Sequence, residues 1–324
     1  MTYKPPFDIT PTILKLSQNI FRELGALSGS KLDITPIKLR KVNSIRTIQA
    51  SLSIEGNTLD LNQVTHIFEG KKVIGPQKDI LEVKNALSVY KEIGKFNPLK
   101  TNDLLKAHDI LMCGLTGLNG QWRNSGVAIF KGEAVAHVPP QAKMVPGLMA
   151  NLFEFLAKDN DTTYLLKACI FHYELEFIHP FTDGNGRMGR LWQQILLMKE
   201  DPVFEYIPVE EIIKANQPLY YQVLSACDKA GNSTRFIEFS LEQILKALTQ
   251  YRESAYPTII DASSRLDYAH NKIGKEWFSR KDYQNLHREI SSATASRDLI
   301  IGLESEALLK KGDKNQTRYS FQKK

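Results

Sequence analysis

Cysteine and long hydrophobic runs are the two features that this sequence most lacks. The three cysteines, Cys113, Cys169 and Cys227, lie far apart and form no CxxC pair, so each is expected to be a small buried side chain in a reducing compartment. No stretch reaches about 18 uninterrupted apolar residues, and residues 1–8 lack the apolar segment of a secretion signal. The sequence therefore predicts a cytoplasmic protein without contact to a membrane.

Internal repeats, low-complexity tracts and a strong excess of one charge are absent as well. With 324 residues, 42% of them hydrophobic and 24% charged, the chain is long enough for two or three domains of ordinary soluble composition. The net charge of +6 is compatible with a phosphate-bearing ligand but does not require one. Composition thus leaves the activity open.

Helical periodicity dominates the part of the chain before residue 256. Apolar side chains recur at helical spacing over residues 13–24, after which Gly25 and Gly29 are expected to end the helix. Segment 127–138, with a turn at 131–133, reads as a β-hairpin. Further helices are predicted at 36–53, 80–93, 102–112, 145–156, 164–177 and in the stretch from 191 to about 251. The expected fold class is mainly α with one small hairpin.

The character of the sequence changes near Tyr256-Pro257. Beyond this point, short helices are predicted at 279–286 and 291–303, followed by a hairpin around the turn 312–315. Two helices and a small hairpin give the outline of a winged helix. Residues 257–324 hold 13 Lys and Arg against nine Asp and Glu.

The segment that carries chemistry has the sequence HPFTDGNGRMGR and runs from His179 to Arg190. It lies between two apolar helices, so it must form a loop that opens onto the N-terminus of the second helix. Gly184-Asn185-Gly186 allows backbone N–H groups to converge on an anion, and the helix dipole favours negative charge at the same place.

Four side chains of this segment complete the outline of a phosphoryl-transfer site. Arg187 and Arg190 lie three residues apart on the first helical turn and can clamp phosphate oxygens. Asp183 is a hard oxygen ligand suited to Mg²⁺. His179 stands just before the glycines, where a neutral imidazole can take the proton of an attacking hydroxyl group. Together these groups indicate phosphoryl transfer.

The segment resembles the signature of the Fic family, H-x-F-x-(D/E)-G-N-G-R-x-x-R, at every fixed position. The resemblance implies the helical Fido fold, with ATP as co-substrate, His179 as general base and Asp183 as the ligand of Mg²⁺. Phe181 resembles the buried anchor of the family's loop. The residues that the resemblance assigns to the nucleotide phosphates are Gly184, Asn185, Gly186, Arg187 and Arg190.

Two further stretches resemble parts of the family's site. The hairpin 127–138 is placed like the family's flap, which would align a target backbone beside the α-phosphate by strand pairing. The stretch from Tyr220 to Asp228 resembles the lining of the base pocket in some relatives. Tyr221 would stack on or hydrogen-bond to adenine, and Asp228 stands where an asparagine is often found. Plain surface or core positions are the alternative for both residues.

A second motif precedes the site in the chain. Ser51, Glu55 and Gly56 resemble the family's inhibitory motif, (S/T)-x-x-x-E-(G/N), on a helix predicted at about 36–56. Ser51 and Glu55 lie four residues apart on one helix face, and Gly56 is a natural helix end. The resemblance implies that Glu55 pairs with Arg190 and thereby forces ATP into an unproductive pose.

The remaining histidines carry no predicted function. His172 is expected to be a satisfied buried histidine, and Glu176 a capping or pairing residue on the helix that feeds the loop. His108, His137 and His270 have no ligand-like spacing, so no zinc site is predicted.

These patterns divide the chain into an N-terminal helical region (1–98), a Fic core (99–255) and a winged-helix module (256–324). The resemblance implies a protein adenylyltransferase, inhibited by Glu55, that transfers AMP from ATP to Tyr, Thr or Ser hydroxyl groups of proteins. The chain itself is expected to be among the modified proteins, and self-modification could take place within a homo-oligomer.

Two alternatives remain open at this point. Within the family, the enzyme would remove AMP or use another donor. Outside it, the chain would be a nucleotide-sensing regulator that binds DNA through its C-terminal module, although the modest charge of that module favours contact with protein.

Overall fold

The chain is described by a computed structural model that covers residues 3–29, 37–127, 129–131, 134–255, 262–287, 290–313 and 316–322. It forms two compact units, Met1–Arg252 and Glu253–Lys324, and each is described by itself. The boundary predicted near residue 98 lies inside the first unit and stays a prediction. Some predicted features fall outside the described residues, namely Pro36, the hairpin tip at 132–133, Tyr256-Pro257 and residues 314–315.

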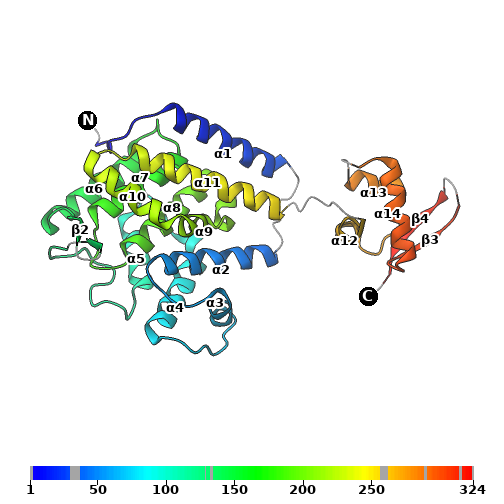
Figure 1. The fold of residues 1–324 in the computed structure, drawn as a ribbon, viewed down its shortest axis with the longest axis horizontal. Coiled ribbons are helices and arrows are strands. Elements are labelled where there is room, and N and C mark those ends of the chain that lie inside the picture. Colours follow the sequence, from blue (N-terminus) through cyan, green and yellow to red (C-terminus); the bar gives the residue numbers. More distant parts are fainter. Residues whose placement is uncertain are drawn as a thin grey trace. The chain divides into compact units, whose positions relative to one another are not determined.

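The first unit is built mainly of helices (Figure 1). They are α1 (Pro11–Gly29), α2 (Ile37–Ile54), α3 (Leu61–Phe68), α4 (Gln77–Lys91), α5 (Thr101–Leu111), α6 (Val145–Lys158), α7 (Tyr164–Ile178), α8 (Asn185–Glu200), α9 (Val209–Ala215), α10 (Gln217–Ala230) and α11 (Thr234–Ala255). Short 3₁₀ helices occur at η1 (Ile93–Lys95), η2 (Ala142–Met144) and η3 (Pro202–Tyr206). The mainly helical fold class is confirmed.

The predicted hairpin consists of β1 (Ile129–Lys131) and β2 (Ala134–His137), which pair antiparallel. Phe130 lies opposite Val135, and the register shifts between Ile129 and Phe130. Such an irregularity bends the ribbon and increases its twist. The hairpin is the only sheet in the described part of the first unit.

The N-terminal helix is longer than the sequence predicts, because α1 continues through Gly25 to Gly29. A glycine inside a helix costs about 1 kcal/mol relative to alanine. Tertiary contacts outweigh this cost: α1 runs alongside α11 (Figure 1), with Glu23 paired to Arg252 at 3.1 Å and Thr10 donating to Glu238 at 2.6 Å.

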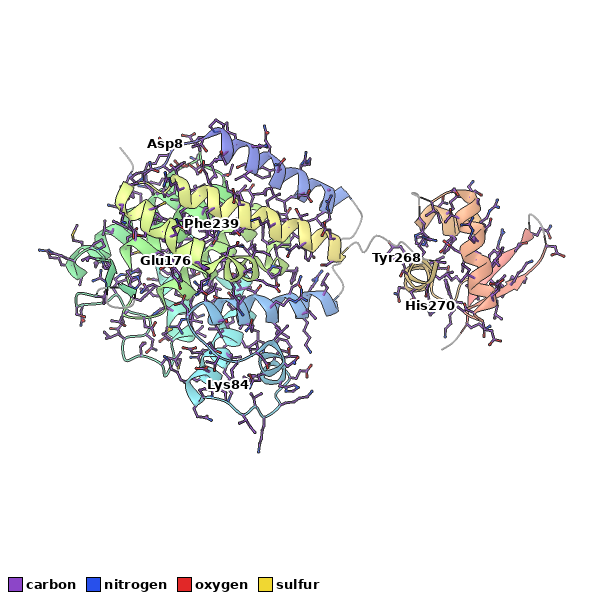
Figure 2. The ribbon with its side chains drawn as sticks, viewed as in Figure 1. Asp8, Lys84, Glu176, Phe239, Tyr268 and His270 are labelled. Atoms are coloured by element: carbon purple, nitrogen blue, oxygen red, sulfur yellow. The ribbon has the colours of Figure 1, made fainter. Side chains whose placement is uncertain are left out.

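Helices α7 and α8 form the centre of the first unit and are buried on nearly every face. Their buried residues are mostly apolar but include charged and amide side chains of the site, such as Arg187 and Arg190. Glu176 of α7 and Phe239 of α11 mark this centre in Figure 2. Helix α2 packs against α9, α3 and α4 and reaches α8. The loop between α7 and α8 therefore projects from the best-packed part of the unit.

The second unit contains α12 (Ala262–Ile273), α13 (Arg280–Leu286), α14 (Ser292–Glu304), β3 (Leu308–Lys311) and β4 (Arg318–Phe321). The two predicted helices and the hairpin are present, and α12 was not predicted; Tyr268 and His270 belong to it (Figure 2). Its core includes Leu266, Phe278, Tyr283, Leu299 and Phe321. The winged-helix assignment stays a prediction.

The cysteine prediction is correct for two residues and wrong for the third. Cys169 and Cys227 are buried, whereas Cys113 is exposed. Cys113 lies in the turn after α5, where its carbonyl group accepts a hydrogen bond from Asn85 at 2.8 Å. Among the described residues, no helix has both the length and the apolar character needed to cross a membrane.

Candidate active site

The segment 179–184 connects α7 to α8 through two left-handed residues. His179 ends α7 with φ 50° and ψ 60°, and its N–H donates to Leu175 O at 2.9 Å. Gly184 precedes α8 with φ 85°, and a Cβ atom there would lie 2.7 Å from Met112 Sδ. Only glycine fits this position, for its backbone angle and for its lack of a side chain.

The side chain of Asn185 closes the loop from inside. Its Oδ1 accepts from the N–H of Phe181 and its Nδ2 donates to the carbonyl of the same residue, each at 2.9 Å. Asn185 is only 2% exposed. Its side-chain amide is therefore occupied, and its backbone N–H is the part that can face a ligand.

His108 of α5 supports the loop and was missed by sequence reasoning. Its ring stacks on Phe181 with centroids 3.7 Å apart. Nδ1 accepts from Gly120 N–H at 2.9 Å, which leaves the proton on Nε2 for donation to Asp183 O at 3.0 Å. Burial lowers the pKa of His108, which favours this neutral form. Its spacing in the sequence carries no signal of this role.

The first arginine of the motif lies between two acidic groups. Arg187 donates to Asp183 Oδ1 at 2.8 Å and to Glu82 Oε1 at 3.0 Å. Glu82 comes from α4 and also accepts from Asn57 Nδ2 at 2.8 Å. Glu82 was not predicted as a site residue, and the only signal for it in the sequence is an acidic residue among the mostly apolar buried positions of α4. The result is an arginine fixed in place beside the loop.

The predicted inhibitory motif contacts the second arginine of the loop motif. Arg190 donates through Nε to Ser51 Oγ at 3.0 Å, and through NH2 to Ser51 O at 2.9 Å and Glu55 Oε1 at 2.7 Å. Gly56 follows with φ 91°. A Cβ atom on Gly186 would collide with Glu55 Oε1, so the carboxylate lies directly on the first turn of α8.

The electrostatics of this pair reflect its burial. Arg190 is 1% exposed. Burial by itself lowers the pKa of the guanidinium, but the Glu55 carboxylate, together with Tyr220 and Glu176, more than offsets that effect and the pKa is raised. A carboxylate at a helix N-terminus is further stabilised by the helix dipole. Glu55 therefore occupies a position that suits an anion.

Two guanidinium nitrogens remain available for a ligand. Arg187 Nε and Arg190 NH1 are buried and have no hydrogen-bond partner in the part of the chain that the structure describes. Buried donors of this kind are rare in folded proteins and call for an explanation. Free guanidinium donors suit an anionic ligand such as a phosphate group.

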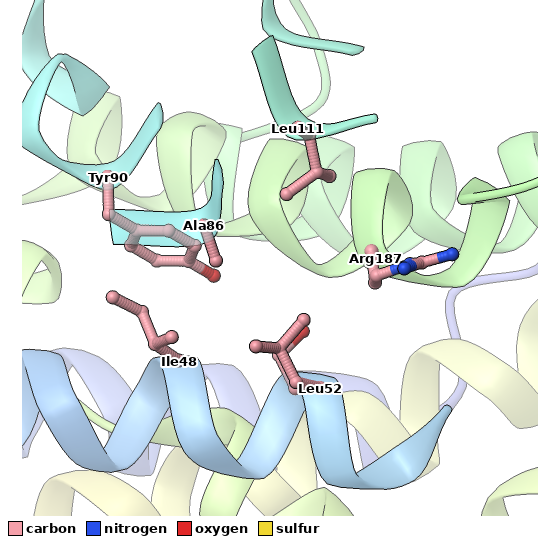
Figure 3. Close-up of a pocket in the computed structure, with 7 residues that line it drawn as sticks. Ile48, Leu52, Ala86, Tyr90, Leu111 and Arg187 are labelled. Atoms are coloured by element: carbon pink, nitrogen blue, oxygen red, sulfur yellow. The ribbon is translucent and has the colours of Figure 1, made fainter. Parts of the chain in front are cut away.

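A small cavity lies between α2 and Arg187 (Figure 3). Its free volume is about 10 Å³, roughly the room that one water molecule needs. The cavity therefore leaves little free space between α2 and the residues that face it. The residues that line the cavity are Ile48, Ser51, Leu52, Ala86, Tyr90, Leu111 and Arg187.

His172 is the satisfied buried histidine that the sequence predicts. Its Nδ1 meets Gln193 Oε1 at 2.6 Å and its Nε2 meets Tyr220 OH at 3.1 Å. Burial lowers its pKa to about 3. Tyr220 also lies 3.2 Å from Glu176 Oε1. Burial, followed by the charge of Glu55, raises the pKa of Glu176 to about 7.

The titration of Glu176 should make stability depend on pH. The folded protein keeps this proton up to about pH 7, whereas the ordinary carboxyl pKa is 4.5. The contribution to stability is thus present below pH 4.5 and is lost as the pH rises through about 7. Relative to Glu176→Gln, the free energy of unfolding of the wild type should fall by roughly 3 kcal/mol over this range.

Urea unfolding of both proteins at several pH values measures this difference. Glu211→Gln, which changes an exposed glutamate of α9, is the matched control and should run parallel to the wild type. Parallel curves for wild type and Glu176→Gln would contradict the buried proton on Glu176.

The stretch predicted to line the base pocket contacts the end of α2, the helix that carries the predicted inhibitory motif. Tyr221 donates to Ile54 O at 3.4 Å, and Gln217 Nε2 donates to the same carbonyl at 2.9 Å. Asp228 lies two helical turns beyond Tyr221, on the same face of α10, and accepts from Tyr173 OH at 3.2 Å. Tyr221 is 39% exposed, which leaves part of its ring open to a ligand.

Asp183 is the candidate metal ligand. Its Oδ1 accepts from Gly184 N at 2.6 Å and from Arg187, and its side chain is 51% exposed. No group of three or more His, Cys, Asp or Glu residues that could hold a metal ion occurs among the described residues. A metal at Asp183 would therefore take its other ligands from phosphate oxygens and water.

Comparison with known proteins agrees with this geometry. Residues 98–197 match the Fic/DOC family. The protein adenylyltransferase Fic of Nematostella vectensis is 29% identical over 239 residues, which cover 69% of this chain and 53% of that protein. The protein of the same name from Aedes aegypti is 30% identical over 248 residues, covering 73% and 48%. The chain spans about half the length of these curated relatives.

A solved structure extends the similarity to the whole chain. The crystal structure of a Fic family protein from Desulfovibrio desulfuricans G20 is 38% identical, with a TM-score of 0.75 and coverage of 99% of both chains. Fic-1 (residues 134–508) from C. elegans, at 18% identity and a TM-score of 0.60, shares the fold. Given the first of these matches, the chain belongs to the Fic family.

Proposed function

We propose that this chain is a nucleotidyltransferase that transfers AMP from ATP to protein hydroxyl groups and is held inactive by Glu55. The observation that carries the proposal is the Glu55 carboxylate on the first turn of α8, paired with Arg190. A helix N-terminus beside two buried arginines suits a phosphate chain. The curated relatives named protein adenylyltransferase support the same activity.

The nucleotide phosphates would lie where Glu55 now lies. The backbone N–H groups of residues 185 and 186 and the free donors of Arg187 and Arg190 would hold them. The N–H of Gly184, which here donates to Asp183 Oδ1, would turn to the same phosphates. Asp183 fits Mg²⁺, because this ion needs only one or two protein carboxylates beside phosphates and waters. When bound, the ion would neutralise charge on the departing pyrophosphate.

His179 would serve as the general base. It stands at the end of α7, partly exposed, immediately before the loop. The oxygen of a Tyr, Thr or Ser side chain attacks the α-phosphorus and forms the new O–P bond as the bond to pyrophosphate breaks. The hydroxyl proton moves to the imidazole of His179. The hairpin β1–β2 would hold the target backbone by strand pairing.

Labelled ATP tests the reaction. The Glu55→Gly variant, which lacks the carboxylate on Arg190, is incubated with Mg²⁺ and ATP labelled on either the α- or the γ-phosphate, and protein-bound label, self-modification included, is read on a denaturing gel. Label from the α-phosphate alone is expected. Label from the γ-phosphate would instead mean kinase-like use of the site. Without label from either, another donor or removal of AMP would replace the proposal.

The second unit would make protein contacts, self-association included. Its exposed apolar side chains, Trp277, Ile300, Ile301 and Leu309, suit a protein surface better than a nucleic acid. Titration of the full chain with duplex DNA at several salt concentrations should give no shift in mobility. A salt-dependent shift would support the DNA-binding alternative.

A further inference from the structure

Arg123 is a buried cation whose hydrogen bonds go to backbone carbonyls. It lies between α5 and β1 and is 2% exposed. Its Nε donates to His179 O at 2.7 Å, NH1 to Ser125 O at 3.0 Å, and NH2 to Pro140 O at 2.5 Å and to Ile178 O at 3.4 Å. Among the described residues, no carboxylate forms a salt bridge with it.

These carbonyls belong to two parts of the site. Ser125 lies just before β1 and Pro140 just after β2, so both ends of the hairpin are held. Ile178 and His179 form the end of α7. The backbone N–H of Arg123 adds a bond to Pro180 O at 2.9 Å. One planar side chain with donors in fixed directions thus joins the hairpin to the backbone of the proposed base.

His179 is the residue in this set that most needs support. Its φ of 50° lies in the left-handed region that residues other than glycine seldom adopt. The bond from Arg123 Nε to its carbonyl fixes the peptide that follows this unusual conformation. The direction in which the imidazole projects is therefore tied to the position of the hairpin.

We propose that Arg123 is a positioning residue that sets the register between a target strand on the β1–β2 hairpin and the imidazole of His179. This inference rests on the proposed function. Arg123 acts through His179 and the hairpin, with its own donors occupied by carbonyls. Because misplacement of a reacting group by about 1 Å can cost roughly 100-fold in rate, loosening this clamp should impair transfer to protein.

The opposing explanation is that Arg123 merely stabilises the fold. Lys167 offers a matched control, since it is also a buried cation, 4% exposed, whose Nζ donates to the carbonyls of Leu156 (3.0 Å) and Asp159. These carbonyls lie at the end of α6, outside the loop and the hairpin. Removing either cation leaves buried or partly buried carbonyls without this donor, but only Arg123 contacts the site.

The test compares Arg123→Lys, Arg123→Gln and Lys167→Gln in a Glu55→Gly background. Three quantities are measured: the ratio of protein-bound AMP to free AMP formed from ATP, the affinity for a non-hydrolysable ATP analogue, and the hydrogen exchange of hairpin amides. Unfolding midpoints are recorded for every variant.

Arg123→Lys keeps the positive charge but loses the planar guanidinium group. Compared with Arg123→Gln, it should therefore restore the unfolding midpoint without restoring transfer of AMP to protein. Its ratio of bound to free AMP should fall roughly 10- to 100-fold, with analogue affinity within about twofold and faster exchange in the hairpin. Lys167→Gln should keep the parent ratio.

Two results would overturn the inference. One is a normal AMP ratio in Arg123→Lys; the other is an equal loss of ratio in Lys167→Gln. A parent that transfers no AMP would instead remove the proposed function. In that case, the hydrogen exchange of the hairpin amides still tests the role of Arg123. Exchange no faster in Arg123→Lys than in the parent would show that Arg123 does not hold the hairpin.

Discussion

Replacing His179 with alanine is expected to lower the rate of AMP transfer by roughly 10²- to 10⁴-fold, the usual contribution of a general base. The imidazole leaves, while the features that hold phosphates stay in place. The Asn185–Phe181 clasp and the Arg187–Glu82 pair do not involve this side chain. Transfer should therefore fall while the affinity for ATP stays close to that of the wild type.

Alanine has one drawback at this position, because His179 adopts a left-handed backbone. Asparagine tolerates that conformation better than alanine and cannot act as a base. His179→Asn should thus lose transfer with a smaller loss of stability. Initial rates with α-labelled ATP, analogue binding and thermal unfolding measure the three effects. Near-normal transfer by a folded His179→Asn would remove His179 from the mechanism.

The segment that carries the chemistry was predictable from the sequence, because its functional residues lie close together in the chain. His179, Asp183 and the two arginines lie within twelve consecutive residues, so helix geometry alone places them together. The helices on either side of this segment were equally predictable from the sequence. α7 and α8 are long and apolar, and the predicted range 164–177 differs from Tyr164–Ile178 by one residue.

The supporting residues were not predictable, because their partners are distant in the chain. Glu82 meets Arg187 across 105 positions, and His108 meets Asp183 across 75. Arg123 reaches His179 across 56. Each is one of several polar residues in an ordinary stretch of the sequence, and only folding reveals what it touches.

The missed helices have local causes. α3 has eight residues, fewer than the window of roughly 11–18 residues over which periodicity is read. Its Asp60–Gln63 capping box was the available signal. In α12, Arg265 occupies a buried position and interrupts the apolar pattern. Its charge is paired with Asp298, 33 residues away in α14, so the compensation is invisible locally.

Replacing Glu55 with glycine is expected to raise AMP transfer by roughly 5- to 150-fold, the range of a typical coupling free energy between sites. The carboxylate leaves Arg190 NH2 and the first turn of α8, so ATP can bind without a competing anion. The same change leaves a buried guanidinium without its acidic partner, which should lower the free energy of unfolding by about 3–5 kcal/mol. Faster transfer by a less stable protein is thus the signature of inhibition by Glu55.

Glu69→Gly is the matched control for this prediction. Like Glu55, Glu69 lies at the end of a helix and precedes a left-handed glycine, Gly70 with φ 73°. Its carboxylate pairs with Lys41 and Lys71 rather than with an arginine of α8. Initial rates with α-labelled ATP should rise in Glu55→Gly and stay unchanged in Glu69→Gly. Equal rates in wild type and Glu55→Gly would mean that the contact with Arg190 does not restrain catalysis, because removing the competing carboxylate would then not have made Arg190 more available to ATP.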